Sequence, residues 1–75
     1  MTKSLYATPA LIRQATGRWD VRAHPGREIV GRIDLHVSGW TATTATGAYA
    51  GLWPTKQAAA EVLVKQAGYE LDEVK

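Results

Sequence analysis

The sequence contains no cysteine and no phenylalanine, and only two histidines. Without cysteine the chain forms neither a disulfide nor a thiolate metal site. His24 and His36 are too few for an all-imidazole zinc site, so we expect no metal and no other cofactor. No apolar run approaches the roughly 18 residues that span a membrane, and residues 1–20 lack the pattern of a secretory signal. We therefore expect a cytoplasmic protein with no membrane partner.

Motifs of common catalytic sites are also missing. The chain has no cysteine nucleophile, no glycine-rich phosphate loop and no HExxH or GxSxG motif. Asp34 and His36 fall on one face of a predicted strand, but a contact between such residues is more often structural than catalytic. A chain of 75 residues leaves little room for a preorganised pocket. We expect that the protein is not an enzyme and has no catalytic residues.

Length and composition predict one small folded domain. The 75 residues are 45% hydrophobic, which fits a folded chain rather than a disordered one. We expect a single domain over residues 1–75, with a folded core at about 10–68 and an acidic C-terminal tail at 69–75. Such a domain buries a small core and is only modestly stable.

Alternation of apolar and polar residues predicts strands at 18–23 and 29–37. Turns are expected at 24–27 and 38–39, and further strands at 40–46 and 48–53. Residues 10–15 form either a short helix that begins at Thr8-Pro9 or a strand that turns at Thr16-Gly17. We favour the strand because the pattern that follows it is strand.

Residues 56–67 are predicted to form a helix, with Thr55 as its N-cap and Gly68 at its end. The fold class is therefore α+β: a three- or four-stranded antiparallel β-meander with one C-terminal helix packed on one face. The apolar side of each strand and one stripe of the helix supply the expected core. Its members are Trp19, Val21, Ile29, Ile33, Leu35, Ala59, Val62 and Leu63.

Apolar residues must face one another across the hairpin of the strands at 18–23 and 29–37, which predicts one register. The expected pairs are Ala23 with Ile29, Val21 with Gly31, Trp19 with Ile33, Asp20 with Arg32, and Arg18 with Asp34. A first hairpin that turns at Thr16-Gly17 would also place Arg13 opposite Asp20. Leu35 and Val37 are expected to point inward, and Val30 outward.

Basic residues concentrate in the strand region, where residues 1–56 carry seven cations and three carboxylates. Every cation between Ser4 and Thr55 is an arginine, whose planar fork suits phosphates and guanine edges. One interpretation is a lattice of cross-strand ion pairs that keeps a solvated face soluble. The other is a nucleic-acid-binding face, whose candidate residues are Arg18, Arg22, Arg27 and Arg32.

Two segments resemble a known family. Residues 17–22 read GRWDVR, and residues 51–59 read GLWPTKQAA with Leu63 downstream. Together they look like the arm-type, AP2-like DNA-binding domain of tyrosine recombinases. The resemblance implies that a sheet contacts DNA in the major groove, through positions that match Arg18, Arg22 and Arg32. The segment from Val30 to Ala50 is longer than in that family.

Protein binding is the alternative function. The chain has three tryptophans and three tyrosines, and these residues are favoured at interfaces. The partner would dock on the sheet face or on an open strand edge, with Trp40 or Tyr49 as anchors. The threonine-rich strand at 41–46 is a candidate edge, through which a homodimer would form by sheet extension.

Overall fold

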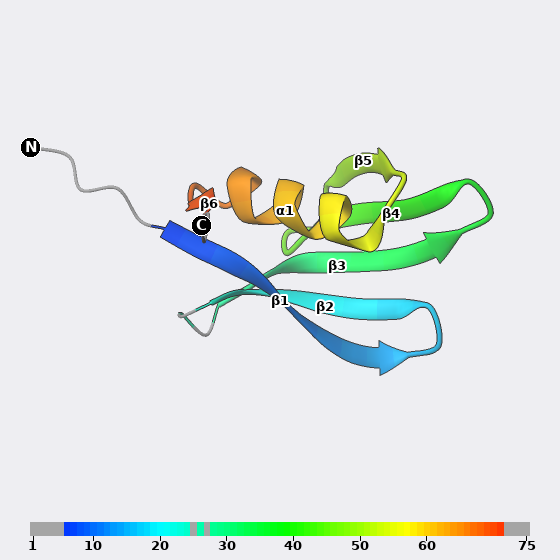
Figure 1. The fold of residues 1–75 in the computed structure, drawn as a ribbon, viewed down its shortest axis with the longest axis horizontal. Helices are drawn as coiled ribbons and strands as arrows, with labels where there is room; N and C mark the ends of the chain where they lie inside the picture. Colours follow the sequence, from blue (N-terminus) through cyan, green and yellow to red (C-terminus); the bar gives the residue numbers. More distant parts are fainter. Residues whose placement is uncertain (1–5, 25, 27, 72–75) are drawn as a thin grey trace, which may run out of the picture.

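The computed structural model describes residues 6–24, 26 and 28–71. They form one sheet and one helix (Figure 1). The elements are β1 (Tyr6–Ala15), β2 (Arg18–His24), β3 (Ile29–His36), β4 (Gly39–Thr44), β5 (Tyr49–Trp53), α1 (Lys56–Gln66) and β6 (Glu70–Leu71). The predicted α+β class with a C-terminal helix is confirmed. The predicted strand count is too low, because five antiparallel strands build the meander.

The sheet order is β5-β4-β3-β2-β1-β6, so each of the first five strands pairs with its neighbour in the sequence. The two-residue strand β6 pairs parallel with the start of β1. Residues 10–15 belong to β1, which confirms the strand that we favoured for them. The hairpin after β1 turns at Thr16-Gly17, where Gly17 adopts a φ of 74° that suits glycine.

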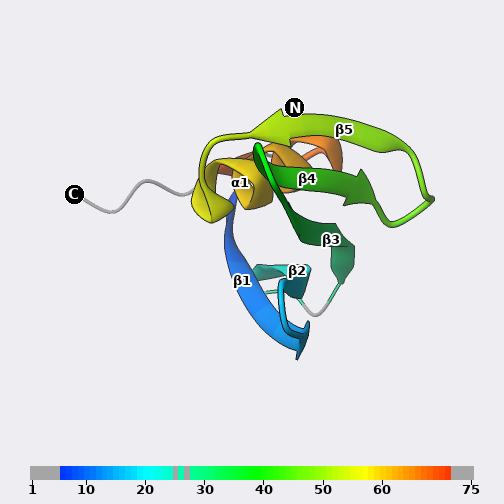
Figure 2. The ribbon, with the colours of Figure 1, turned by 90° about the vertical axis from the view of Figure 1, so that its right-hand side faces the viewer.

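Helix α1 lies on one face of the sheet, and Figure 2 shows the sheet curving around it. The side chains between them form the core. Its buried members are Ala7, Val21, Ala23, Val30, Ile33, Ala42, Ala59, Ala60, Leu63 and Val64. We call the opposite side of the sheet, which carries no helix, the outer face. Strand alternation places Arg18, Asp20 and Arg22 on it.

Four of the five predicted pairs between β2 and β3 are confirmed. The fifth is wrong because Arg22, rather than Ala23, stands opposite Ile29. Val30 is an extra residue on β3 that bulges between two pairs and points into the core. Ile29 is consequently on the outer face and 39% exposed, so it is not the core residue that alternation predicted.

Leu35 was expected in the core and Val37 was expected to point inward, but both are exposed, at 59% and 98%. Figure 1 gives the reason, since the hairpin of β3 and β4 extends past the first turn of α1. The inner side of the end of this hairpin therefore has no helix to pack against. Trp19 and Trp40 lie nearby and are only partly buried.

The helix buries Ala59 and Leu63 as predicted, but its buried surface continues through Ala60 and Val64. Val62 is only partly buried against the core, and Gln66 is exposed. Because the sheet curves around the helix, the buried arc is wider than one stripe and is turned away from Gln66.

Thr55 caps the helix as predicted, since its Oγ1 accepts a hydrogen bond of 3.0 Å from the backbone N–H of Ala58. We expect Thr55→Ala to lower the free energy of unfolding by about 1 kcal/mol, because it leaves that N–H without its partner. Urea denaturation followed by circular dichroism would measure the change. Thr55→Ser retains the hydroxyl and should stay close to the wild type; equal stability of all three proteins would disprove the role of the cap.

The segment that follows the helix, residues 69–71, returns to the sheet. The Tyr69 hydroxyl donates a hydrogen bond of 2.7 Å to Glu28 Oε1, next to the turn between β2 and β3. This bond to a carboxylate, together with desolvation and the Glu28 charge, raises the pKa of Tyr69 above its usual value. Glu70 and Leu71 then pair with Tyr6 and Ala7. The strands thus reach beyond residues 10–68 at both ends.

Candidate nucleic-acid interface

Three of the four candidate arginines lie on the outer face. Arg18 and Arg22 alternate along β2, and Arg32 on β3 stands opposite Asp20, between them. The fourth candidate, Arg27, falls outside the described residues. The confirmed register therefore brings Arg18 and Arg32 close together on the surface that the helix leaves free.

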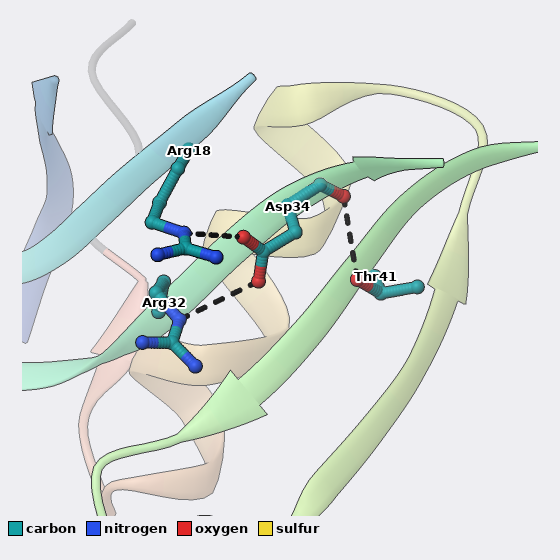
Figure 3. Close-up of polar contacts among 4 residues, drawn as sticks. All are labelled: Arg18, Arg32, Asp34 and Thr41. Atoms are coloured by element: carbon teal, nitrogen blue, oxygen red, sulfur yellow. Dashed lines mark hydrogen bonds and ion pairs between the residues drawn. The ribbon is translucent and has the colours of Figure 1, made fainter. Parts of the chain in front are cut away.

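Asp34 holds both of these arginines (Figure 3). Arg18 Nε donates to Asp34 Oδ1 at 3.0 Å, and Arg32 Nε lies 3.4 Å from Oδ2. Thr41 Oγ1 donates to the backbone carbonyl of Asp34 at 3.3 Å. The arginine side chains are about half exposed, at 53% and 48%. Such exposed ion pairs add little stability, so their main effect is to orient the two guanidinium groups.

The terminal amino groups of Arg18 and Arg32 remain available. A guanidinium has five N–H donors, and both contacts with Asp34 run through Nε. Within the described ranges, the Nη groups of the two arginines make no hydrogen bond to another residue. The Asp34 carboxylate thus neutralises one of the two positive charges. The Nη groups of both arginines, which we call the donor forks, remain available to a ligand.

Asp20 has no ion-pair partner among residues 6–24, 26 and 28–71. It stands opposite Arg32, but the Arg32 side chain contacts Asp34 instead. Arg13 was predicted opposite Asp20, and this is wrong. Gln14 is an extra residue between the pairs of Arg13 and Ala15, so Arg13 faces Trp19 and Ile12 faces Asp20.

Arg22 also has no carboxylate partner in the described part of the chain, as the predicted register implies. It stands opposite Ala10 on β1 and Ile29 on β3. Its Nε is buried without a hydrogen-bond partner. The part of the Arg22 side chain up to Nε therefore packs against its neighbours on the sheet. Arg22 thus has fewer N–H donors accessible to a ligand than Arg18 or Arg32.

A depression of about 400 Å³ lies beside the arginines, and sequence patterns did not predict it. Its lining comes from β2, β3, β4 and the turn after β4. The lining residues are Asp20, Ile29, Gly31, Arg32, Thr43, Thr44, Ala45 and Gly47. The depression depends on the bulge at Val30, which brings Ile29 to the outer face and leaves no local mark in the sequence.

The proposed strand edge for a protein partner is corrected. Strand β4 is internal, between β3 and β5, so the threonine-rich strand has no free edge. The sheet's edges are β1, which β6 covers only at Tyr6 and Ala7, and β5, where Tyr49 is 69% and Leu52 43% exposed. Gly51 has a φ of 111° there, and the Trp53 indole donates to the Ala50 carbonyl. This irregular backbone is a poor template for pairing with a second chain.

Trp40 is half-buried and is not the fully exposed anchor that protein docking would favour. The Lys56 ammonium lies 4.2 Å from the centroid of the Trp19 ring and 5.8 Å from that of Trp40. A cation over an aromatic face is attracted to it. Lys56 therefore covers part of the aromatic surface at the start of α1.

Comparisons with protein-family models, with curated proteins and with solved structures find no match for this chain. Within the described residues, no helix is long and apolar enough to cross a membrane. The same residues contain no group of three or more histidine, aspartate or glutamate side chains placed to hold a metal ion.

Proposed function

We propose that the protein is a small, non-enzymatic accessory protein that binds nucleic acid through its outer face. The observation that carries the proposal is the pair of guanidinium groups fixed on Asp34, with the Nη donors of Arg18 and Arg32 unused. Guanidinium forks bind phosphate oxygens in pairs. Because the outer face carries no helix, an extended polyanion has access to both forks at once.

The charge balance of this face supports the same function. Its three arginines, Arg18, Arg22 and Arg32, outnumber Asp20 and Asp34. The resemblance of residues 17–22 and 51–59 to arm-type DNA-binding domains implies contacts with DNA at the same three arginines. Phosphate contacts of this kind give affinity without sequence preference and steer the encounter with the ligand.

The test is a salt titration of binding to random-sequence duplex DNA and to random-sequence single strands. We expect the dissociation constant to rise steeply with salt, because phosphate contacts release counterions. Replacing both Arg18 and Arg32 by glutamine should lower the salt slope by about two. The matched control is Lys65→Gln in α1, which removes one cation from the opposite side of the molecule and should lower the slope far less.

Absence of binding to either nucleic acid at low salt would refute the proposal. Docking of a protein on the same face would then be the remaining function, since Tyr49 and Leu52 expose apolar surface there. In that case Tyr49→Ala, rather than the arginine variants, would abolish binding of a co-purifying partner. Equal salt slopes for the double arginine variant and for Lys65→Gln would place the phosphate contacts elsewhere on the protein.

A further inference from the structure

The unpaired carboxylate of Asp20 is not explained by phosphate binding, which it would oppose. Three arginines surround it in the sheet: Arg18 and Arg22 on its own strand, and Arg32 directly across. It forms no ion pair with any of them in the described structure. A carboxylate that keeps its acceptor sites free on an arginine-bearing face is a candidate ligand-recognition group.

Asp20 lies at the depression described above, beside Arg32. The two residues are direct backbone partners across β2 and β3 and both line the depression, so acceptor oxygens and N–H donors border the same space. Ile29 lines the same depression and is 39% exposed, which provides an apolar wall. Thr43 and Thr44 add hydroxyl groups. An apolar wall with a few convergent polar groups is typical of a small-ligand site.

The arrangement of donors and acceptors matches one nucleobase. The Watson–Crick edge of guanine presents two adjacent donors, N1–H and the 2-amino group, beside the O6 acceptor. A carboxylate accepts from both donors at once, while a neighbouring guanidinium donates to O6. Adenine and cytosine place a ring-nitrogen acceptor next to their amino group, and thymine flanks its N3–H with two carbonyl oxygens. Each of these would set an acceptor against the Asp20 carboxylate.

We propose that the depression binds an unpaired guanine base of a single-stranded nucleic acid, with Asp20 and Arg32 recognising its edge. This rests on the proposed function: Arg18 binds the backbone, and Arg32, whose Nε contacts Asp34, has one Nη group for the base and one for the backbone. Asp20 is more deeply buried than Arg18 and Arg32, whose side chains are about half exposed. A duplex, whose guanine edges are already paired, would meet the arginines first. An unpaired base reaches the recessed carboxylate and packs against the apolar side chain of Ile29.

The experiment measures fluorescence anisotropy of oligothymidylate strands of about 12 nucleotides, with and without one central guanine. We expect the wild type to bind the guanine strand about 5- to 150-fold more tightly, the range for one good bidentate base contact. Inosine, which lacks the 2-amino group, should lose part of this preference. 7-Deazaguanine should retain it, because N7 is not used.

Asp20→Asn separates recognition from simple charge. The amide has nearly the same shape but only one acceptor, so the guanine preference should disappear while binding to plain oligothymidylate strengthens. Glu61→Gln is the matched control, since it makes the same charge change on α1 and should leave the preference intact. Unchanged thermal unfolding would show that the Asp20 variant is folded.

Two results would overturn the inference and leave the proposed function standing. One is a wild type that binds all strands equally well. The other is an Asp20→Asn variant that gains the same affinity for every strand and retains a preference for guanine. Absence of binding to any strand at low salt would overturn the proposed function as well, so the two failures are distinguishable.

Discussion

Replacing Leu63 by alanine is expected to lower the free energy of unfolding by about 2–5 kcal/mol. Leu63 is fully buried in the core that joins α1 to the sheet. The truncation removes apolar contacts and leaves a cavity between the helix and Gly31, which the leucine side chain approaches closely. A domain of this size is only marginally stable, so much of the variant would be unfolded. Urea denaturation followed by tryptophan fluorescence would measure the loss.

Leu52→Ala is the matched control, because it removes the same atoms from a side chain that is 43% exposed on the outer face. Its effect on stability should be well below that of Leu63→Ala. If the two variants unfold at the same urea concentration, the helix does not dock through Leu63 and the described core is wrong.

Gly31→Ala should destabilise the protein by about 3 kcal/mol, the upper end of the usual range for overpacking, or more. A Cβ at this position would overlap the Thr43 carbonyl oxygen and lie 2.9 Å from Leu63 Cδ2. A side chain can rotate away from such a contact, but the backbone carbonyl of β4 cannot move without breaking the sheet. Thermal unfolding followed by circular dichroism would measure the effect.

Gly47→Ala measures the conformational cost of replacing a glycine that has a positive φ, without a steric clash. Gly47 has a φ of 95°, and a Cβ there would meet no atom within 4 Å. Alanine therefore pays only the conformational penalty of about 1–2 kcal/mol. A larger loss for Gly31→Ala would confirm the close approach of β3 and β4; an equal or smaller loss would contradict it. The double variant Gly31→Ala/Leu63→Ala should not recover stability, since the clash with Thr43 persists.

The register between β2 and β3 could be predicted because two independent patterns demand it. The pairs of Trp19 with Ile33 and of Val21 with Gly31 align apolar residues, and the same register aligns Arg18 with Asp34. A shift by one residue would have put apolar side chains on the solvent face. This constraint was enough to place Arg18 and Arg32 together on the outer face.

The bulges could not be predicted from the same patterns. Ile29 and Val30 are both β-branched and apolar, so exchanging which one enters the core leaves the hydrophobic pattern nearly unchanged. The choice depends on packing against the helix, which lies far from these residues in the sequence. The extra residue Gln14 likewise moves Arg13 away from Asp20. For this reason the free carboxylate and the depression beside it emerged only in three dimensions.

The helix could be delimited from its cap and stop residues, but its buried face could not. Helical spacing selects Val62 beside Ala59 and Leu63, whereas the curved sheet also buries Ala60 and Val64. Sheet curvature is a property of the whole meander and has no counterpart in the sequence of residues 56–67.

The order of elements along the chain has a consequence for biosynthesis. All five antiparallel strands leave the ribosome before the helix that covers them, and each can pair with the strand made just before it. Synthesis of the 11 residues of α1 then takes about 0.5–2 s at ordinary elongation rates. During that interval Val21, Ile33 and Ala42 have no helix above them. The apolar side of the nascent meander therefore stays uncovered until the helix docks, while its other side carries the charged residues of β2 and β3.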